Sequence, residues 1–165
     1  RAIIPAMKAP SIRELAAALG CLAAVAAFLI PHAMGERRRG QEASAEAVLR
    51  SAWKAEQTHR TRNGRYAGDL AALTDAGLLP PGLATGLKDG YRFGLVGLDE
   101  RGAPLDSLKR FAYYAVPEAY GDTGTLTFLV DAVGLVYARD TGAGAPPVSW
   151  PADDPTGKGW TILGQ

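Results

Sequence analysis

The sequence has few of the residues that build disulfides and metal sites. It contains one cysteine, Cys21, and two histidines, His32 and His59, among 165 residues. A single cysteine excludes an internal disulfide framework, and no His/Cys cluster has the spacing of a metal site. No glycine-rich loop stands in the strand-to-helix context that binds phosphate. We therefore expect a non-catalytic protein without catalytic, cofactor-binding or metal-binding residues, in which both histidines are ordinary polar side chains.

An excess of charge of either sign is also missing. The 18 Lys+Arg residues and 17 Asp+Glu residues give a formal net charge of +1. Nucleic-acid-binding domains usually carry a strong basic field, so we expect no nucleic-acid partner. The one dense cluster of like charge is Arg37, Arg38 and Arg39. This cluster predicts an anchor for lipid phosphates or, alternatively, a docking point on a protein partner.

Charge is absent altogether from residues 15–34 (LAAALGCLAAVAAFLIPHAM). A helix of that length measures ~30 Å, which is the thickness of the hydrocarbon core of a bilayer. We therefore predict a transmembrane helix over residues 11–35, with the lipid bilayer as a partner. Ser11 and Glu14 have the spacing of a capping box at its start.

Small residues line one face of this predicted helix, among them Gly20 and Ala23. Small side chains let two helix backbones approach each other closely. We therefore expect this helix to contact other membrane-protein subunits or copies of the chain itself.

The helical pattern continues beyond residue 40. An apolar stripe recurs there at helical spacing, formed by Ala45, Val48, Leu49, Ala52 and Trp53. Charged residues largely occupy the other faces, namely Glu46, Arg50, Lys54 and Glu56. The spacing predicts one helix over residues 11–62, with a transmembrane half and an amphipathic half that packs on a domain. A short second helix is expected over residues 70–76.

From residue 90 onward the hydrophobic period changes to two. Four segments have the composition of strands, namely residues 91–96, 110–116, 125–130 and 135–138. They predict an α+β fold in which a four-stranded antiparallel meander packs one face on the long helix. Residues 141–165 form a loop-rich tail, in which Trp150 and Trp160 are expected to contact the domain. Asp153 and Asp154 are adjacent carboxylates in this tail, where the family resemblance described below implies a calcium site.

Taken together, these features resemble type IV pilins and the major pseudopilins of type II secretion. Glu14 stands seventeen residues before Pro31, the spacing between the N-terminal glutamate and the helix-kinking proline of the family. Residues 46–67 resemble the stretch in which the family's helix ends in an Asn-Gly-Arg-Tyr turn. Residues 123–137 (TGTLTFLVDAVGLVY) resemble its closing hairpin.

The resemblance implies a structural subunit of a pilus or of a type II secretion pseudopilus. Residues 1–10 would be the leader and residues 36–140 the pilin-like domain, on the periplasmic or extracellular side. The protein would be a single-span protein of the bacterial inner membrane, and Glu14 would register neighbouring subunits. Gly20, Ala23, Pro31 and the Arg37–Arg38–Arg39 cluster would belong to the same assembly and anchor region.

The leader departs from the family pattern. The prepilin peptidase cuts after a glycine, and the new N-terminus is usually a phenylalanine, whereas Ala9 and Pro10 stand at these places. Arg13 also puts a charge where the family has an apolar residue. These departures favour an alternative function, in which an uncleaved single-span accessory subunit stabilises a larger membrane complex, such as a photosynthetic or respiratory one.

Overall fold

The computed structural model describes the backbone of residues 12–106 and 109–164, and the side chains from Met34 onward within those ranges. The described elements are α1 (Ile12–Asn63), α2 (Leu70–Asp75), β1 (Leu87–Lys88), β2 (Tyr91–Leu95), β3 (Ala112–Pro117), β4 (Leu126–Asp131), β5 (Val136–Asp140) and β6 (Thr161–Leu163), with short 3-10 helices η1 (Pro81–Leu83) and η2 (Pro155–Lys158). The chain divides into two compact units, residues 1–36 and 37–165, and α1 has residues in both.

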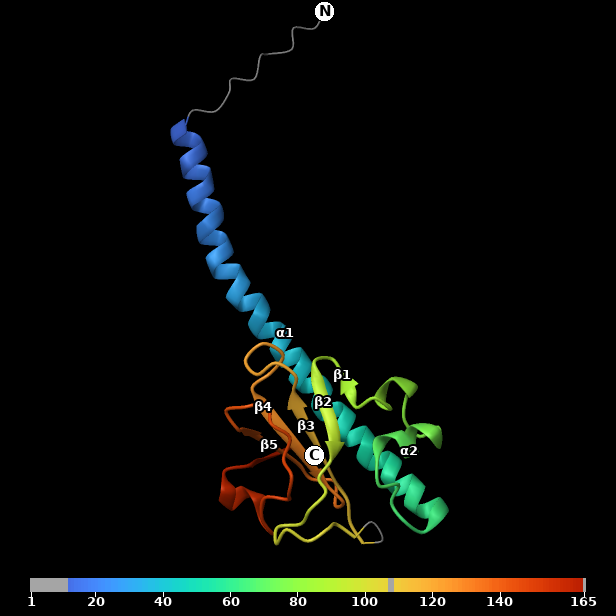
Figure 1. The fold of residues 1–165 in the computed structure, drawn as a ribbon. Helices are drawn as coiled ribbons and strands as arrows, with labels where there is room; N and C mark the ends of the chain where they lie inside the picture. Colours follow the sequence, from blue (N-terminus) through green and yellow to red (C-terminus); the bar gives the residue numbers. More distant parts are fainter. Residues whose placement is uncertain (1–11, 107–108, 165) are drawn as a thin grey trace, which may run out of the picture. The chain divides into compact units, whose positions relative to one another are not determined.

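The six strands form one antiparallel sheet in the order β1-β2-β3-β4-β5-β6, which is a meander. Figure 1 labels β1 to β5 of this sheet. Short turns join several of the neighbours, because antiparallel strands need no long crossover. Asp89 and Gly90 form the β1–β2 turn with φ values of 49° and 76°. Two consecutive positive φ values are typical of the type I′ turn of a two-residue hairpin.

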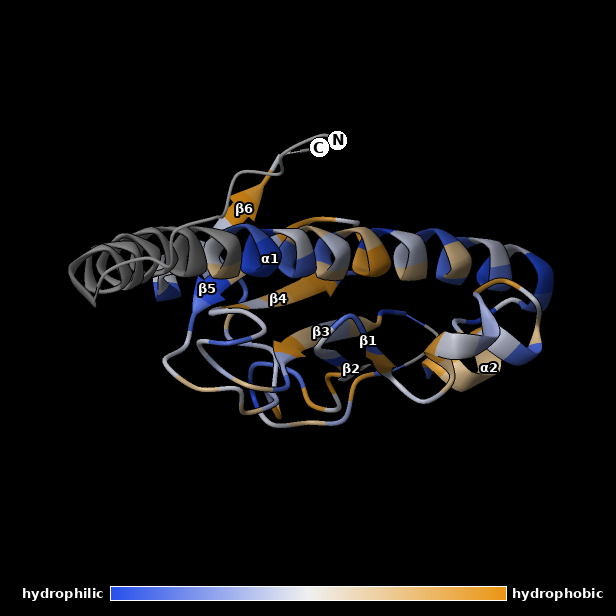
Figure 2. Cartoon of the chain, turned by 90° about the horizontal axis from the view of Figure 1, so that it is seen from above, coloured by the Kyte–Doolittle hydropathy of each residue, from blue (hydrophilic) through white to orange (hydrophobic). Residues whose placement is uncertain are grey.

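One face of the sheet packs against the C-terminal part of α1. Four of the five residues of the predicted stripe are buried there, since Ala45, Val48, Leu49 and Ala52 are each at most 5% exposed. The fifth, Trp53, is half-buried. Their partners are aromatic and branched side chains of the strands, which include Tyr91, Phe93, Tyr113, Phe128, Val130 and Val136. Figure 2 shows β3 and β4 beside α1, with the colours of apolar residues over much of their length. This helix-on-sheet cluster is the main core.

Two glutamates of α1 fix the helix on the sheet through hydrogen bonds. Glu42 Oε1 accepts from the backbone N–H of Thr125, at 2.9 Å, at the entry to β4. Glu56 is fully buried, and its Oε1 accepts from the hydroxyl of Tyr113 at 2.6 Å. The other oxygen, Oε2, accepts from the N–H of Ala67 at 2.7 Å, in the chain that follows α1. Both oxygens of the buried carboxyl group therefore have partners, as burial of a polar group requires.

The opposite face of the sheet is covered by the C-terminal segment. Trp150 and Trp160 are 8% and 7% exposed and pack with Tyr137, Leu129, Ala112 and Val96. The rings of Tyr137 and Trp150 meet edge to face, with centroids 5.7 Å apart. The segment then returns as β6, which pairs with β5. The tail predicted as loop-rich therefore contributes a second apolar cluster and an edge strand.

The predicted four-stranded meander is wrong, because the sheet has six strands. The two additional strands, β1 and β6, contain two and three residues. An alternation of period two cannot be recognised in segments that short. They are strands because a neighbouring strand offers hydrogen-bond partners, which is a tertiary effect.

The prediction of a transmembrane half is also overturned. Within the part of the chain that the structure describes, no helix combines the length and the apolar character that crossing a membrane requires. From Met34 to Asn63, α1 carries charged side chains on nearly every turn. The prediction that the protein spans the bacterial inner membrane once is wrong for the same reason. The segment behind that prediction, residues 15–34, lies almost wholly outside the residues whose side chains are described.

The β4–β5 turn rests on an aromatic side chain of α1. The indole N–H of Trp53 and the side-chain amide of Gln57 both donate to the carbonyl of Ala132, each at 3.2 Å. Gly134 follows with a φ of 96°, and a Cβ at this position would lie 2.7 Å from Cε2 of Trp53. Trp53 is half-buried rather than central to the core.

We predict that Glu56→Ala lowers the free energy of unfolding by about 3 kcal/mol, because it leaves the Tyr113 hydroxyl and the Ala67 N–H unsatisfied in the core. Tyr113→Phe should cost about 1–2 kcal/mol, since it removes one of these bonds. Urea unfolding followed by circular dichroism measures both. Glu46→Ala, which removes a half-exposed partner of Arg50 on the same helix, is the control and should cost less than about 0.5 kcal/mol. Equal costs for Glu56→Ala and Glu46→Ala would contradict the structural role of Glu56.

Gly134→Ala should destabilise the domain by about 1–3 kcal/mol through backbone strain, with a further cost from contact with Trp53. The matched control is Gly142→Ala, where φ is 68° but no atom lies within 4 Å of the added Cβ. The control isolates the strain, so the difference between the two variants measures the contact. Thermal unfolding of both variants tests this, and a smaller effect at Gly134 than at Gly142 would contradict it.

Candidate functional site

Several residues predicted for assembly lie outside the described side chains. These are Glu14, Gly20, Ala23 and Pro31, together with Cys21 and His32. The backbone assignment of α1 runs through all of them as helix. Their predicted roles stay predictions.

The arginine cluster at the start of the second unit is described. Arg37 and Arg39 are exposed and Arg38 is half-buried. Arg37 lines a polar groove with Asp89 and Glu118 among other residues. The side-chain oxygen of Ser44 donates to Asp89 across this groove at 2.6 Å. The structure therefore brings Arg37 close to carboxylates of two sheet loops.

The remaining candidates have local structural roles. Nδ1 of His59 lies 3.0 Å from the carbonyl of Arg65, at the end of α1. Asp154 caps η2, since its Oδ1 accepts from the N–H of Thr156 at 2.9 Å. The hydroxyl and N–H of Thr156 lower the pKa of Asp154. Among the described residues, no group of three or more His, Cys, Asp or Glu side chains is placed to hold a metal ion. Calcium binding at Asp153 and Asp154 stays a prediction.

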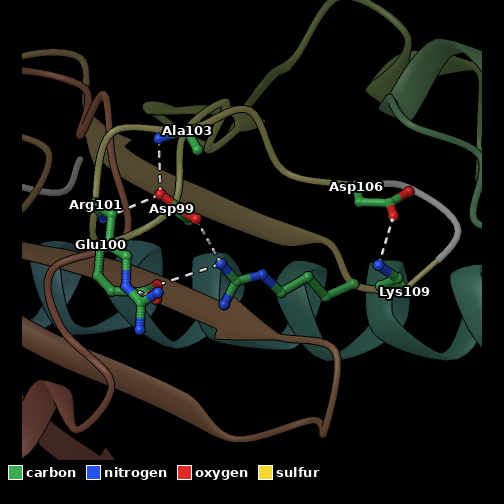
Figure 3. Close-up of polar contacts among 7 residues, drawn as sticks. Asp99, Glu100, Arg101, Ala103, Asp106 and Lys109 are labelled. Carbon is green, nitrogen blue, oxygen red and sulfur yellow. Dashed lines mark hydrogen bonds and ion pairs between the residues drawn. The ribbon is translucent and has the colours of Figure 1, made fainter.

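A polar cluster around Arg110 organises the loop between β2 and β3 (Figure 3). The carboxylate of Asp99 accepts from the N–H groups of Ala103, at 2.7 Å, and Arg101, at 2.9 Å. Nη2 of Arg110 lies 3.4 Å from Oδ2 of Asp99 and 3.3 Å from Oε2 of Glu100. Two carboxylates therefore face one guanidinium group.

The hydrogen bonds of this cluster favour the ionised carboxylates. The N–H of Ala103 lowers the pKa of Asp99, with help from the N–H of Arg101 and the charge of Arg110. The pKa of Glu100 is lowered by its own backbone N–H and then by Arg110. Both groups therefore carry their charge at neutral pH and compensate the charge of Arg110.

Beside this cluster lies a cleft of about 200 Å³. Its lining is Leu105, Arg110, Phe111, Ala112, Asp131, Ala132, Val133, Tyr137, Trp150 and Asp153. These residues come from the loop before β3 and the start of β3, from the end of β4, the β4–β5 turn and β5, and from the C-terminal segment. The N–H of Trp150 donates to the carbonyl of Leu98 at 2.9 Å, which ties that segment to the loop. We call this feature the Arg110 cleft.

Asp131 is the carboxylate that the fold positions most firmly in the cleft. Its Oδ1 accepts from the N–H groups of Gly134, at 2.8 Å, and Leu135, at 2.9 Å, so the side chain stabilises the β4–β5 turn. Its Oδ2 lies 3.4 Å from the hydroxyl of Tyr137. Burial, followed by the charge of Asp131, raises the pKa of Tyr137, so this hydroxyl keeps its proton. Oδ2 therefore has acceptor capacity left for a ligand.

Sequence reasoning did not find this cleft. Of the residues that line it, the sequence predicts a site role only for Asp153, as a calcium ligand. The sequence Asp99–Glu100–Arg101–Gly102 does indicate the turn beside the cleft. It is typical of a turn in which an aspartate carboxylate accepts hydrogen bonds from the backbone N–H groups that follow it. Nothing local in the sequence shows that Trp150 binds the backbone of Leu98, or that Trp150 and Asp153 line one cleft with Arg110.

Comparison with known proteins finds a similarity for one segment of the chain. A protein family described as "Protein of unknown function (DUF2950)" matches residues 105–151. No curated protein matches the chain. The matched segment contains β3, β4 and β5 and nine of the ten residues that line the Arg110 cleft, all except Asp153. The similarity thus coincides with the central strands and the cleft.

We predict that the backbone amides of Arg101 and Ala103 titrate together with Asp99. Their ¹H–¹⁵N shifts should change below the ordinary aspartate pKa of about 3.9, because both amides donate to this carboxylate. A pKa that is lower in the folded chain stabilises the fold above the ordinary value, and this stabilisation is lost as the pH falls through the folded pKa. In Asp99→Asn the inflection should disappear from both amides. The Gly142 amide donates to a different carboxylate, that of Asp140, and is the internal control. Its inflection should remain in Asp99→Asn. An inflection above the ordinary value would contradict the structure.

Proposed function

We propose that this protein is a non-catalytic, pilin-like structural subunit that packs through the N-terminal part of α1 into a multi-subunit assembly. The observation that carries the proposal is the length of α1 relative to the sheet on which it packs. α1 contains 52 residues, which corresponds to ~78 Å at ~1.5 Å per residue. The longest strands contain six residues, or ~20 Å at ~3.3 Å per residue.

The core uses only a short section of this helix. Among the described residues of α1, those that are buried lie between Ala45 and Glu56. Helices are stabilised in water mainly by packing of an apolar face rather than by propensity. The uncharged sequence of residues 15–34 therefore requires other surfaces to pack against. Helices of neighbouring subunits with small residues at the contact would supply such surfaces.

The resemblance to pilins supports the same proposal. An N-terminal helix whose second half packs on an antiparallel meander is the arrangement that the resemblance implies. The main core, with Glu42 and Glu56 holding the helix on the sheet, would keep α1 and the sheet together as one subunit. A subunit of this kind needs no reacting group, because its work is to present a helix to its neighbours.

The experiment that tests the proposal is purification of the native protein, with intact mass measurement and negative-stain electron microscopy. Regular filaments made of this chain alone would support a pilus-like or pseudopilus-like subunit. A monomer at all concentrations, with no co-purifying protein, would overturn the proposal. A fixed ratio with other proteins would retain the structural role and identify the partners.

We predict that Gly20→Leu or Ala23→Leu weakens assembly and leaves the sheet domain folded. Larger side chains would separate helix backbones that small residues allow to approach. We expect the chain concentration for half-assembly, measured by sedimentation velocity, to rise about tenfold, which equals about 1.4 kcal/mol. The control is Ala71→Leu, at an exposed position of α2, which should assemble as the unmodified chain does. Unchanged assembly of both α1 variants would remove the small-residue contact from the proposal.

A further inference from the structure

We propose that the Arg110 cleft binds a primary alkylammonium group, such as a lysine side chain or a small free amine. The inference does not depend on the proposed function, because the cleft is built within residues 105–153. It rests on the size, the lining and the charge of the cleft.

The size selects a small ligand. Ligand pockets for drug-sized molecules and cofactors usually measure about 300–1,000 Å³, whereas this cleft measures about 200 Å³. At about 30 Å³ per water molecule, it has room for roughly six waters. A four-carbon chain with a terminal amine fits that space, and a nucleotide or an organic cofactor does not.

The lining suits an alkyl chain. Leu105, Phe111, Ala132 and Val133 provide apolar surface, and Trp150 adds an aromatic wall. Val133 is 77% exposed at the tip of the β4–β5 turn, where an alkyl chain that enters the cleft would cover it. Removing this apolar side chain from water would contribute to binding.

The charge of the cleft favours a cation. Asp131 and Asp153 both line it, and Asp153 is exposed. Among the described residues that line the cleft, Arg110 is the one cation, and it is already paired with Asp99 and Glu100. The carboxylates of Asp99, Glu100, Asp131 and Asp153 still outnumber the guanidinium groups of Arg110 and Arg101, which pairs with Glu100 at 4.0 Å. A bound carboxylate or phosphate would therefore meet repulsion.

The hydrogen-bonding capacity favours a primary amine over a quaternary one. Oδ2 of Asp131 has one long contact, at 3.4 Å, to the Tyr137 hydroxyl. An alkylammonium group has three N–H donors for carboxylate oxygens, whereas a quaternary ammonium has none. The rings of Tyr137 and Trp150 are 5% and 8% exposed, so they do not offer the open faces of an aromatic cage.

The test is a ¹H–¹⁵N NMR titration of the full chain with n-butylammonium chloride, against NaCl at equal ionic strength. We expect saturable shifts of the Trp150 indole N–H and the amides of Gly134 and Leu135, with a dissociation constant on the order of millimolar. The amide of Gly142, which is not among the lining residues of the cleft, is the internal control and should move less. No saturable shift would overturn the proposal.

Variants and matched ligands separate charge recognition from simple apolar binding. Asp153→Asn should weaken butylammonium binding at least threefold, whereas Asp75→Asn, on α2, should leave it unchanged. 1-Butanol and sodium butyrate should bind at least tenfold more weakly than butylammonium. Equal binding of 1-butanol, preferential binding of butyrate, or unchanged binding in Asp153→Asn would each overturn the proposal.

A lysine peptide with blocked ends, Gly-Lys-Gly, separates the two sources of the ammonium group. Binding at least tenfold tighter than that of butylammonium would support a lysine of a protein partner. Equal affinities would support recognition of the amine alone, and thus a free small amine. Absence of binding by both would contradict the proposal.

Discussion

The structure of the second unit depends on one buried carboxyl group. Glu56 accepts hydrogen bonds from Tyr113 in β3 and from the backbone of Ala67, so it connects α1, the sheet and the chain that leaves the helix. Burial of such a group is costly unless both oxygens are paired. The pairing is satisfied in one register of the helix on the sheet, because a shift of one residue would turn Glu56 away from Tyr113. The apolar stripe supplies the favourable burial, and Glu56 specifies where the stripe sits.

The sheet is covered on both faces, and the two covers differ in kind. α1 covers one face with a regular helical stripe, while the C-terminal segment covers the other with two tryptophans. The C-terminal segment is mostly irregular. Because its side chains do not repeat at a regular spacing, spaces remain where they contact the sheet. The Arg110 cleft lies at such a place, between the segment, the β4–β5 turn and the loop before β3. The same arrangement that completes the core therefore creates the cleft.

The two proposals concern different parts of the molecule. Assembly concerns α1 before the sheet domain, whereas all but one of the residues that line the cleft lie in the segment that resembles a family of unknown function. The charges also differ, because residues 15–34 carry none while the cleft is surrounded by carboxylates. A subunit that joins its neighbours through a helix can therefore keep a separate site on its sheet domain. The polar groove that Arg37 lines with Asp89 and Glu118 is a second polar surface, between the helix and two sheet loops.

The sequence by itself determined the features that depend on local periodicity. A period of 3.6 residues identifies the stripe from Ala45 to Ala52, and a period of two identifies the strand segments near residues 91–95, 112–117, 126–131 and 136–140. Both periods are visible in the sequence because the residues on one face of a helix or strand recur at a fixed spacing. The tertiary structure alone decided the rest. β1 and β6 exist only through their neighbours. Glu56 was assigned to a polar face by its charge, although it lies seven residues after Leu49 and therefore on the buried face. The Arg110 cleft joins residues up to 48 positions apart, from Leu105 to Asp153, and chain folding, not spacing, brings them together.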